Sequence, residues 1–411
     1  MSRVRTPKRL RSRITTFGDR LSSEKATDMA TRQIASSIAF VGIVAAGVFS
    51  ASLSGQSRST PPALVITATA GKPVEYKTPR TPWGDPDLQG VWSSDDLENV
   101  PMSRPAQFKE LYLDDAQFAA RQAQVDRGAK QRDTSAESSF RFDYARRAVR
   151  QTSLIVDPPD GRLPAIKPAV QGRIMPRGTY GPGPLNSWED FSLYERCITR
   201  GIAGSILRVI YGNGNRIVQA PGVVALSYEM LPDTRLFYTD GRTHIGASIG
   251  QYLGDSRAHW EGEELVVETT NLTDKTAIGV NGNGVRHSKE MVITERFRRV
   301  ADNIVQYQAT YDDPVTYERP FTVSFPLTPL DGGNLLPYDC HPGNTAISMS
   351  LGGERLEERR VAEDFAKGII RPKRTVQDDG AGVGAAPPAG RGGGPAPLPV
   401  GAATGERDQE K

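Results

Sequence analysis

The segment Ser256–Thr276, SRAHWEGEELVVETTNLTDKT, constrains the fold of this chain most strongly. It predicts a β-hairpin with one arm at His259–Glu261, a turn at Gly262-Glu263 and a second arm at Leu265–Thr269. Aromatic and β-branched residues on both sides of a glycine-containing turn are typical of paired strands. A hairpin alone is marginally stable in water, so we expect this one to belong to a larger sheet.

Further strand-like runs surround this hairpin. In Val292–Arg298 polar and apolar side chains alternate, so that Ile293, Glu295 and Phe297 share one face. Pro221-Gly222 and Ala301-Asp302-Asn303 predict turns between neighbouring strands. The chain is therefore expected to be mainly β: an antiparallel up-and-down meander or barrel, calycin- or lipocalin-like by analogy, with peripheral helices. The other runs are Leu88–Trp92, Ile217–Gln219, Val223–Met230, Leu236–Tyr238, Ile304–Tyr311 and Thr322–Leu327.

Helices are expected in two places. An insertion at about 105–150 contains a helix capped by Asp114 and a second helical piece at Phe140–Val149. The second piece is basic, and its arginines predict either a face for an acidic ligand or, as we favour, a solvated face. A charged helix is also expected within Gly352–Ile369. The arginines are Arg141, Arg146, Arg147 and Arg150.

Both ends of the chain differ from the middle. Ile34–Leu53 carries no charge and predicts a signal peptide over residues 1–54, with Met29 as an alternative start. The same run is nearly long enough to remain as an uncleaved membrane anchor, the one membrane contact that we expect. Residues 55–80 form a predicted linker, 81–371 a single β-rich domain, and 372–411 a disordered low-complexity tail. The expected location is periplasmic or secreted.

Charge and cysteine content narrow the alternatives. The 51 Lys and Arg against 48 Asp and Glu leave a near-balanced chain, which gives no electrostatic case for nucleic acid as a partner. Cys197 and Cys340 are the only cysteines. In an exported protein they are expected to form a disulfide, worth roughly 4–5 kcal/mol in the chain-entropy model, although two separate buried thiols are the alternative.

Several short motifs carry a resemblance. They are PDLQGVW (86–92), VDPPDGRLP (156–164), YERCITRG (194–201), IVQAPG (217–222), DGRTH (240–244), GDSRAHWEGEELVVETTNLTDKT (254–276), TERFRRV (294–300) and YDCHPGN (338–344). Over most of Trp83–Arg360 the chain resembles a large group of uncharacterised, mostly exported bacterial proteins. The group usually has Pro at the position of Thr243 and Glu at that of Pro342. The resemblance implies export and implies no particular activity.

No motif specifies a reaction. Gly246–Gly250 matches G-x-S-x-G, but the sequence around it predicts neither the strand before nor the helix after that a nucleophile elbow needs. Tyr211–Asn215 and Gly279–Gly284 are glycine-rich without the context of a phosphate loop. The four histidines form no close ligand pair, so neither a metal site nor a cofactor is predicted.

Polar residues in turns beside strands form the candidate site. A Cys197–Cys340 bond would bring Arg196 and His341 together, and Arg196, Arg242 and His244 would suit an anionic ligand. The alternative is a structural ion-pair network that joins Glu195 to Arg242 or Asp240 to Arg196. The candidate ligand-binding residues are Glu195, Arg196, Asp240, Arg242, His244, Asp274 and His341.

These observations favour an exported β-barrel-like protein that binds a small amphipathic or anionic ligand. One alternative is a periplasmic hydrolase or isomerase that uses His244 or His341 with an arginine. Another is a structural cell-envelope protein without a small-molecule site. A barrel cavity lined by aromatic residues would favour the first, and a barrel filled by them the last. The aromatic residues in question are Trp188, Phe191, Tyr194, Trp260, Phe297, Tyr307 and Tyr311.

Overall fold

The computed structural model describes residues 76–133, 144–170, 185–209, 211–279, 284–330, 332–338, 340 and 343–369. The predicted signal peptide, most of the predicted linker, the low-complexity tail and His341 lie outside these ranges. Within them, no helix combines the length and the apolar character that crossing a membrane requires.

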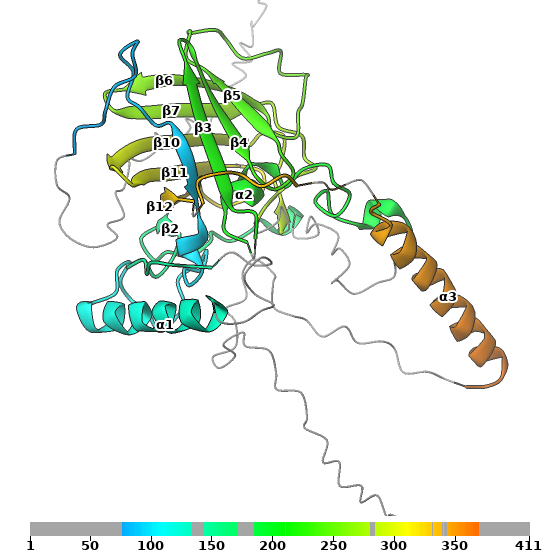
Figure 1. The fold of residues 1–411 in the computed structure, drawn as a ribbon. Coiled ribbons are helices and arrows are strands. Elements are labelled where there is room, and N and C mark those ends of the chain that lie inside the picture. The colour runs from blue at the N-terminus through cyan, green and yellow to red at the C-terminus, as the bar shows by residue number, and fades with distance from the viewer. Residues whose placement is uncertain are drawn as a thin grey trace, which may run out of the picture. The chain divides into compact units, whose positions relative to one another are not determined.

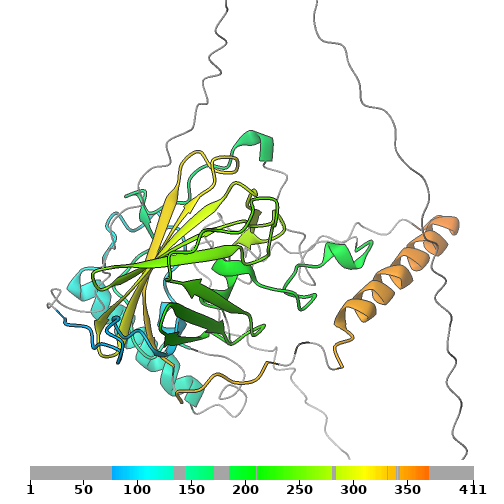
Figure 2. The same ribbon diagram turned by 90° about the horizontal axis from the view of Figure 1, so that it is seen from above.

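A closed barrel of nine strands forms the centre of the described chain, and in both views the strands curl around a shared interior (Figure 1, Figure 2). Each strand is hydrogen-bonded to the next, and β1 pairs with β12 to close the ring. In order, the strands are β1 (Gly90–Ser93), β3 (Gly214–Ala220), β4 (Val223–Tyr228), β5 (Thr234–Tyr238), β6 (Asp255–Glu261), β7 (Glu264–Thr270), β10 (Val292–Ala301), β11 (Ile304–Asp312) and β12 (Phe321–Pro329).

Three short strands lie outside the ring. β2 (Ile155–Asp157) adds to β12, while β8 (Ala277–Ile278) and β9 (Val285–Arg286) form a separate antiparallel pair. The expected mainly β barrel with peripheral helices is confirmed. So is the predicted hairpin, since β6 and β7 pair from Asp255↔Thr270 to Glu261↔Glu264 around the turn at Gly262-Glu263.

One joint of the barrel departs from the antiparallel pattern. β5 and β6 are parallel and share a single residue pair, Tyr238↔Arg257. A closed ring with an odd number of strands cannot alternate direction all the way round, so at least one joint has to be parallel. The connection between the two strands, residues 239–254, therefore returns along the barrel as a long loop instead of a tight turn.

Aromatic rings fill the barrel interior. The face of β10 that carries Phe297 points inward, and its ring centroid lies 6.0 Å from that of Phe237 and 5.0 Å from that of Tyr307. Tyr307 in turn lies 5.0 Å from Phe325. A cavity bordered by Ile202, Met291 and Tyr311 measures only about 10 Å³, close to the minimum for one water molecule. Of the seven aromatic residues named from the sequence, four are buried, namely Phe191, Phe297, Tyr307 and Tyr311. Tyr194 and Trp260 are partly exposed, and Trp188 is exposed.

A buried ion pair lies among these rings. Arg235 donates to both carboxylate oxygens of Glu295, at 2.9 and 2.5 Å, and both side chains are at most 2% exposed. Hydroxyl groups supply further partners: Tyr307 donates to Glu295, and the terminal nitrogens of Arg235 also donate to Tyr228, Ser256 and Thr269. Each charge is therefore matched, as burial demands.

Three α-helices belong to the described chain; the second is fully buried, and the third has no buried residue. α1 (Asp115–Asp133) begins where expected, because Asp114 accepts the backbone N–H of Gln117. The other two are α2 (Gly201–Ile206) and the charged α3 (Ala346–Ala366), which starts before the predicted Gly352. The expected second helical piece is wrong for Tyr144–Val149, which is irregular. Carboxylates of Asp96 and Glu98 bind the backbone N–H groups there in place of helical carbonyls.

The arginines of that irregular segment are engaged within the protein. Arg147 pairs with Asp96 at 2.7 Å, and Arg150 pairs with Asp115 at 2.8 Å. Arg146 lies over the ring of Tyr144, and Arg141 falls outside the described residues. These contacts fit a structural role better than a face for an acidic ligand.

Candidate functional site

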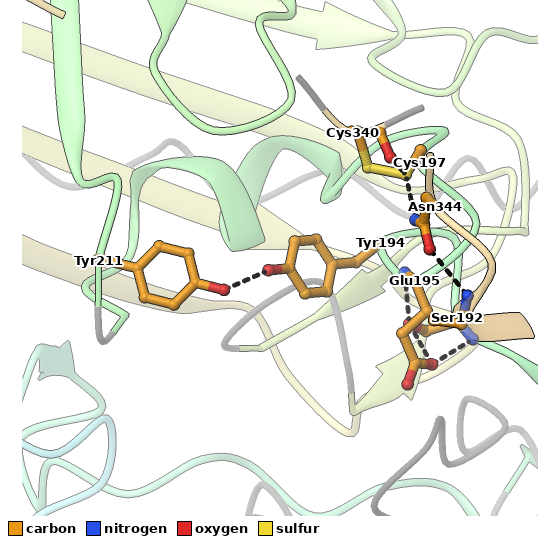
Figure 3. Close-up of a disulfide and its surroundings, with 8 residues drawn as sticks. Ser192, Tyr194, Glu195, Cys197, Tyr211, Cys340 and Asn344 are labelled. Atoms are coloured by element: carbon orange, nitrogen blue, oxygen red, sulfur yellow. Dashed lines mark hydrogen bonds between the residues drawn. A yellow bond between two sulfur atoms is a disulfide. The ribbon is translucent and has the colours of Figure 1, made fainter. Parts of the chain in front are cut away.

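The Cys197–Cys340 disulfide joins two distant segments of the chain (Figure 3). The Cα atoms are 5.8 Å apart across a sequence separation of 143, so the predicted pairing is confirmed. The Cys197 segment is held locally, because Glu195 Oε2 accepts hydrogen bonds from the backbone N–H and the hydroxyl of Ser192. Glu195 therefore shapes the turn that carries Arg196 and Cys197.

Arg196 lines a pocket of about 390 Å³ that we call the Trp188 pocket. Its guanidinium carbon lies 5.0 Å from the ring centroid of Trp188, and Nε is buried without a hydrogen-bond partner among the described residues. Lys275 and Arg286 add two more cations to the wall, whereas Glu189 is its one acid. The remaining wall is apolar or aromatic: Phe191, Leu193, Ile198 and Tyr252.

Asp240 and Arg242 lie elsewhere, on the β5–β6 connection, and bind each other. The guanidinium Nε of Arg242 is 2.9 Å from both carboxylate oxygens of Asp240, and Arg242 lies 3.9 Å from the ring centroid of Tyr238. The hydrogen bonds from Arg242 lower the pKa of Asp240 below its ordinary value. Among the ion pairs of the described residues, neither Glu195–Arg242 nor Asp240–Arg196 occurs. Asp274 is exposed beside Lys275.

His244 is clamped between carboxylates. Its Nδ1 is 2.8 Å from Asp255, and its Nε2 is 3.3 Å from Glu268. Asp255 is itself fixed by the backbone N–H of Ile245 and by Arg257. Because both ring nitrogens face carboxylates, these contacts tie the β5–β6 connection to β6 and β7. His341, the other histidine of the enzymatic alternative, lies outside the described residues.

Ser248 of the G-x-S-x-G segment lines the same pocket as His244, which has a volume of about 660 Å³. The segment is a loop without a following helix, as the sequence predicted. Asn271 organises it by donating to the carbonyl oxygens of Gly246 and Ile249. Since no hydrogen bond joins Ser248 to His244 in the described chain, the nucleophile-elbow arrangement is not formed.

A cluster of phenols beside the disulfide was not predicted from the sequence. The hydroxyls of Tyr194 and Tyr211 point toward each other at 3.5 Å (Figure 3), and Tyr338 lies near Tyr194. Burial raises the pKa of Tyr194 far above its ordinary value, and the neighbouring Tyr211 and Tyr338 raise it further. Arg200 lies next to the cluster and is 1% exposed. The sequence did contain a signal for this cluster, because Tyr194, Arg200 and Tyr338 belong to the two cysteine-containing motifs, YERCITRG and YDCHPGN.

His287 is neutral and structural. It is 2% exposed, its Nδ1–H donates to the carbonyl of Ser288, and Nε2 accepts from the hydroxyl of Thr276. Burial lowers the pKa of His287 below its ordinary 6.5. No cluster of three metal-binding side chains occurs in the described part of the chain.

Acidification is expected to destabilise the protein through His287. The unfolded chain binds a proton near pH 6.5 and the folded chain only at lower pH, so the unfolding free energy falls as the pH drops below about 6.5. Urea unfolding at pH 7.5 and 5.5 measures this loss. His287→Gln, which cannot take up the proton, should show a smaller loss between the two pH values. An equal loss in both proteins would contradict the assignment.

Comparisons with known proteins give no further guide to the site. No protein-family model matches the chain, and neither the curated proteins nor the solved structures contain a match.

Proposed function

We propose that this protein is exported and binds a small amphipathic anion in the Trp188 pocket. The observation that carries the proposal is the convergence of three cations, Arg196, Lys275 and Arg286, with exposed aromatic surface in one pocket. Trp188 is 54% exposed, an unusual position for the largest apolar side chain. A ligand with an aromatic or apolar body and one anionic group would match both the apolar and the basic part of the pocket wall.

The ligand is proposed for the outside of the barrel because the inside is occupied. Tyr307, Phe297 and Phe325 fill the space that a lipocalin-like cavity would need. The pocket is instead built by loops that the barrel and the disulfide hold in place, which is where binding groups commonly lie. Arg196 is already positioned over Trp188, so part of the entropic cost of ordering its side chain is removed before a ligand arrives.

Export is supported by two features. Disulfides persist mainly in oxidising compartments such as the periplasm or the cell exterior, and Cys197 and Cys340 are bonded. The uncharged run at Ile34–Leu53 is the second feature, and it has the composition of a signal peptide. The resemblance to exported bacterial proteins agrees with both.

The binding proposal can be tested with a fluorescent anion, 1-anilinonaphthalene-8-sulfonate. We expect the folded protein to bind it more tightly than the uncharged N-phenyl-1-naphthylamine, because the cations act only on the sulfonate. Arg196→Gln and Lys275→Gln should each weaken sulfonate binding by about 3- to 10-fold, with little change for the uncharged probe. Fluorescence titration at two salt concentrations measures both effects.

Lys289→Gln is the matched control. Lys289 is an exposed lysine on the wall of the other pocket, the one that contains His244. This variant should bind the sulfonate as the unaltered protein does. If all three variants bind equally, or if both probes bind with equal affinity, the anion does not occupy the Trp188 pocket.

A further inference from the structure

Arg200 is a buried cation whose hydrogen bonds are incomplete. It directly precedes α2 and is 1% exposed, yet its Nε and Nη2 have no hydrogen-bond partner within the described ranges. Nε of Arg235 and of Arg104 also lacks a partner among the described residues, but their terminal nitrogens are bonded: Arg235 binds Glu295, and Arg104 donates to the carbonyls of Lys109 and Pro159. An unmatched buried charge is costly, so a folded protein that keeps Arg200 there calls for an acceptor.

The charge itself is present at neutral pH. Burial lowers the pKa of Arg200 only to about 10, so the guanidinium stays protonated. The groups with the largest electrostatic influence on it are the phenols of Tyr194, Tyr338, Tyr211 and Tyr228, not carboxylates. A neutral phenol next to a cation offers a weak acceptor, whereas its O–H can donate to an anion.

Three phenols lie near Arg200. Tyr194 lies with its ring centroid 6.0 Å from the guanidinium carbon of Arg200, and its hydroxyl meets that of Tyr211 at 3.5 Å, the long limit for a hydrogen bond. Tyr338 lies near Tyr194, on the segment that the disulfide fixes at Cys340. All three tyrosines are partly exposed, so the cluster lies between Arg200 and solvent.

We propose that Arg200 and the hydroxyls of Tyr194, Tyr211 and Tyr338 form an internal site for the carboxylate of a small molecule. The Nε–H and Nη2–H groups define the edge of a guanidinium that binds a carboxylate through two parallel hydrogen bonds. The ligand enters by separating the long Tyr194–Tyr211 contact. Arg200 is not part of the wall of the Trp188 pocket, so this site does not depend on the proposed function.

The test compares the protein with Arg200→Met in zwitterionic buffer of low anion content, using sodium acetate as the probe and sodium chloride at equal ionic strength as the reference. Acetate should raise the thermal midpoint of the unaltered protein, by roughly 5–10 °C at 100 times the dissociation constant. Arg200→Met should show no acetate-specific rise. Without acetate it should be at least as stable as the unaltered protein, because it removes an unmatched charge.

Arg104→Met provides the control, since it removes a buried arginine whose Nη1 donates to two backbone carbonyl oxygens. It should lower the midpoint and keep the acetate response. The proposal is overturned if Arg200→Met responds to acetate as the unaltered protein does. It is equally overturned if Arg200→Met loses as much stability as Arg104→Met in the buffer alone, because Arg200 would then be satisfied within the chain.

Milder variants keep the test decisive if Arg200→Met does not fold. Tyr211→Phe and Tyr338→Phe each remove one hydroxyl from a partly exposed ring. Each should weaken acetate binding by about 10-fold in calorimetric titration, the value of one hydrogen bond to a charged group. Unchanged affinity in both variants would exclude the phenols from the site and contradict the proposal.

Discussion

Glu295→Leu is expected to lower the free energy of unfolding by about 3–5 kcal/mol, because it leaves the Arg235 guanidinium buried without its counter-charge. Burial opposes the charge on Arg235, but the adjacent Glu295 carboxylate keeps the pKa of the guanidinium above its ordinary value. The hydroxyls of Tyr228, Ser256 and Thr269 cannot replace a carboxylate. Urea unfolding monitored by tryptophan fluorescence measures the loss.

The double variant Arg235→Met with Glu295→Leu is the decisive comparison. Removing both charges should recover much of the loss, since well-packed apolar residues often replace a buried ion pair at little cost. Glu261→Gln is the surface control: it alters a 48% exposed carboxylate paired with Arg296, so its effect should stay below about 1 kcal/mol. A double variant as unstable as Glu295→Leu alone would show that packing, not charge, dominates the barrel centre.

Cys197→Ser is expected to cost a similar amount, about 4–5 kcal/mol in the chain-entropy model, because the bond closes a loop across a separation of 143 residues. Cys340→Ser and the double variant should show the same loss, since each removes one and the same bond. Chemical denaturation of the three variants measures it.

A reducing agent supplies the control for this prediction. It should destabilise the unaltered protein by the amount that Cys197→Ser does, and leave the double variant unchanged. Equal stability of the reduced and oxidised protein would mean that other contacts already hold the segment around Tyr338. That outcome would also remove the disulfide from the list of groups that position the phenol cluster.

Local patterns in the sequence were sufficient to predict much of the barrel. The turn at Gly262-Glu263 and the alternation in Val292–Arg298 depend only on residues one or two positions apart, and both predictions were confirmed. The pairing of Cys197 with Cys340 followed from there being no other cysteine to bond. The turn, the alternation and the cysteine pairing can be predicted without knowledge of the tertiary structure.

Other features depend on packing between distant segments and could not be read from the sequence. The direction of β5 relative to β6 follows from ring closure by β1 and β12, which no local pattern encodes. Whether aromatic residues line or fill a barrel depends on its diameter. The irregular backbone at Tyr144–Val149 results from carboxylates about 50 positions away, those of Asp96 and Glu98.

The candidate site was predicted less completely than the fold. Arg196 does lie in a basic pocket, but Lys275 and Arg286 join it through folding alone. Asp240, Arg242 and His244 form local clamps on one connection, and His341 falls outside the described residues. Arg200 could not be predicted as a site residue, because its distinguishing feature is a buried Nη2 without a hydrogen-bond partner among the described residues, which depends on the fold.

The parallel joint has a consequence for how the wall of the barrel holds together. The other joints of the barrel share between two residue pairs, at β1–β12, and nine, at β10–β11, whereas β5 and β6 share one. A side chain fastens them instead: Arg235 starts on β5 and reaches Ser256 on β6, Thr269 on β7 and Glu295 on β10. The guanidinium group of Arg235 thus connects β5 to β6 from inside the barrel, at the joint with the fewest backbone pairs.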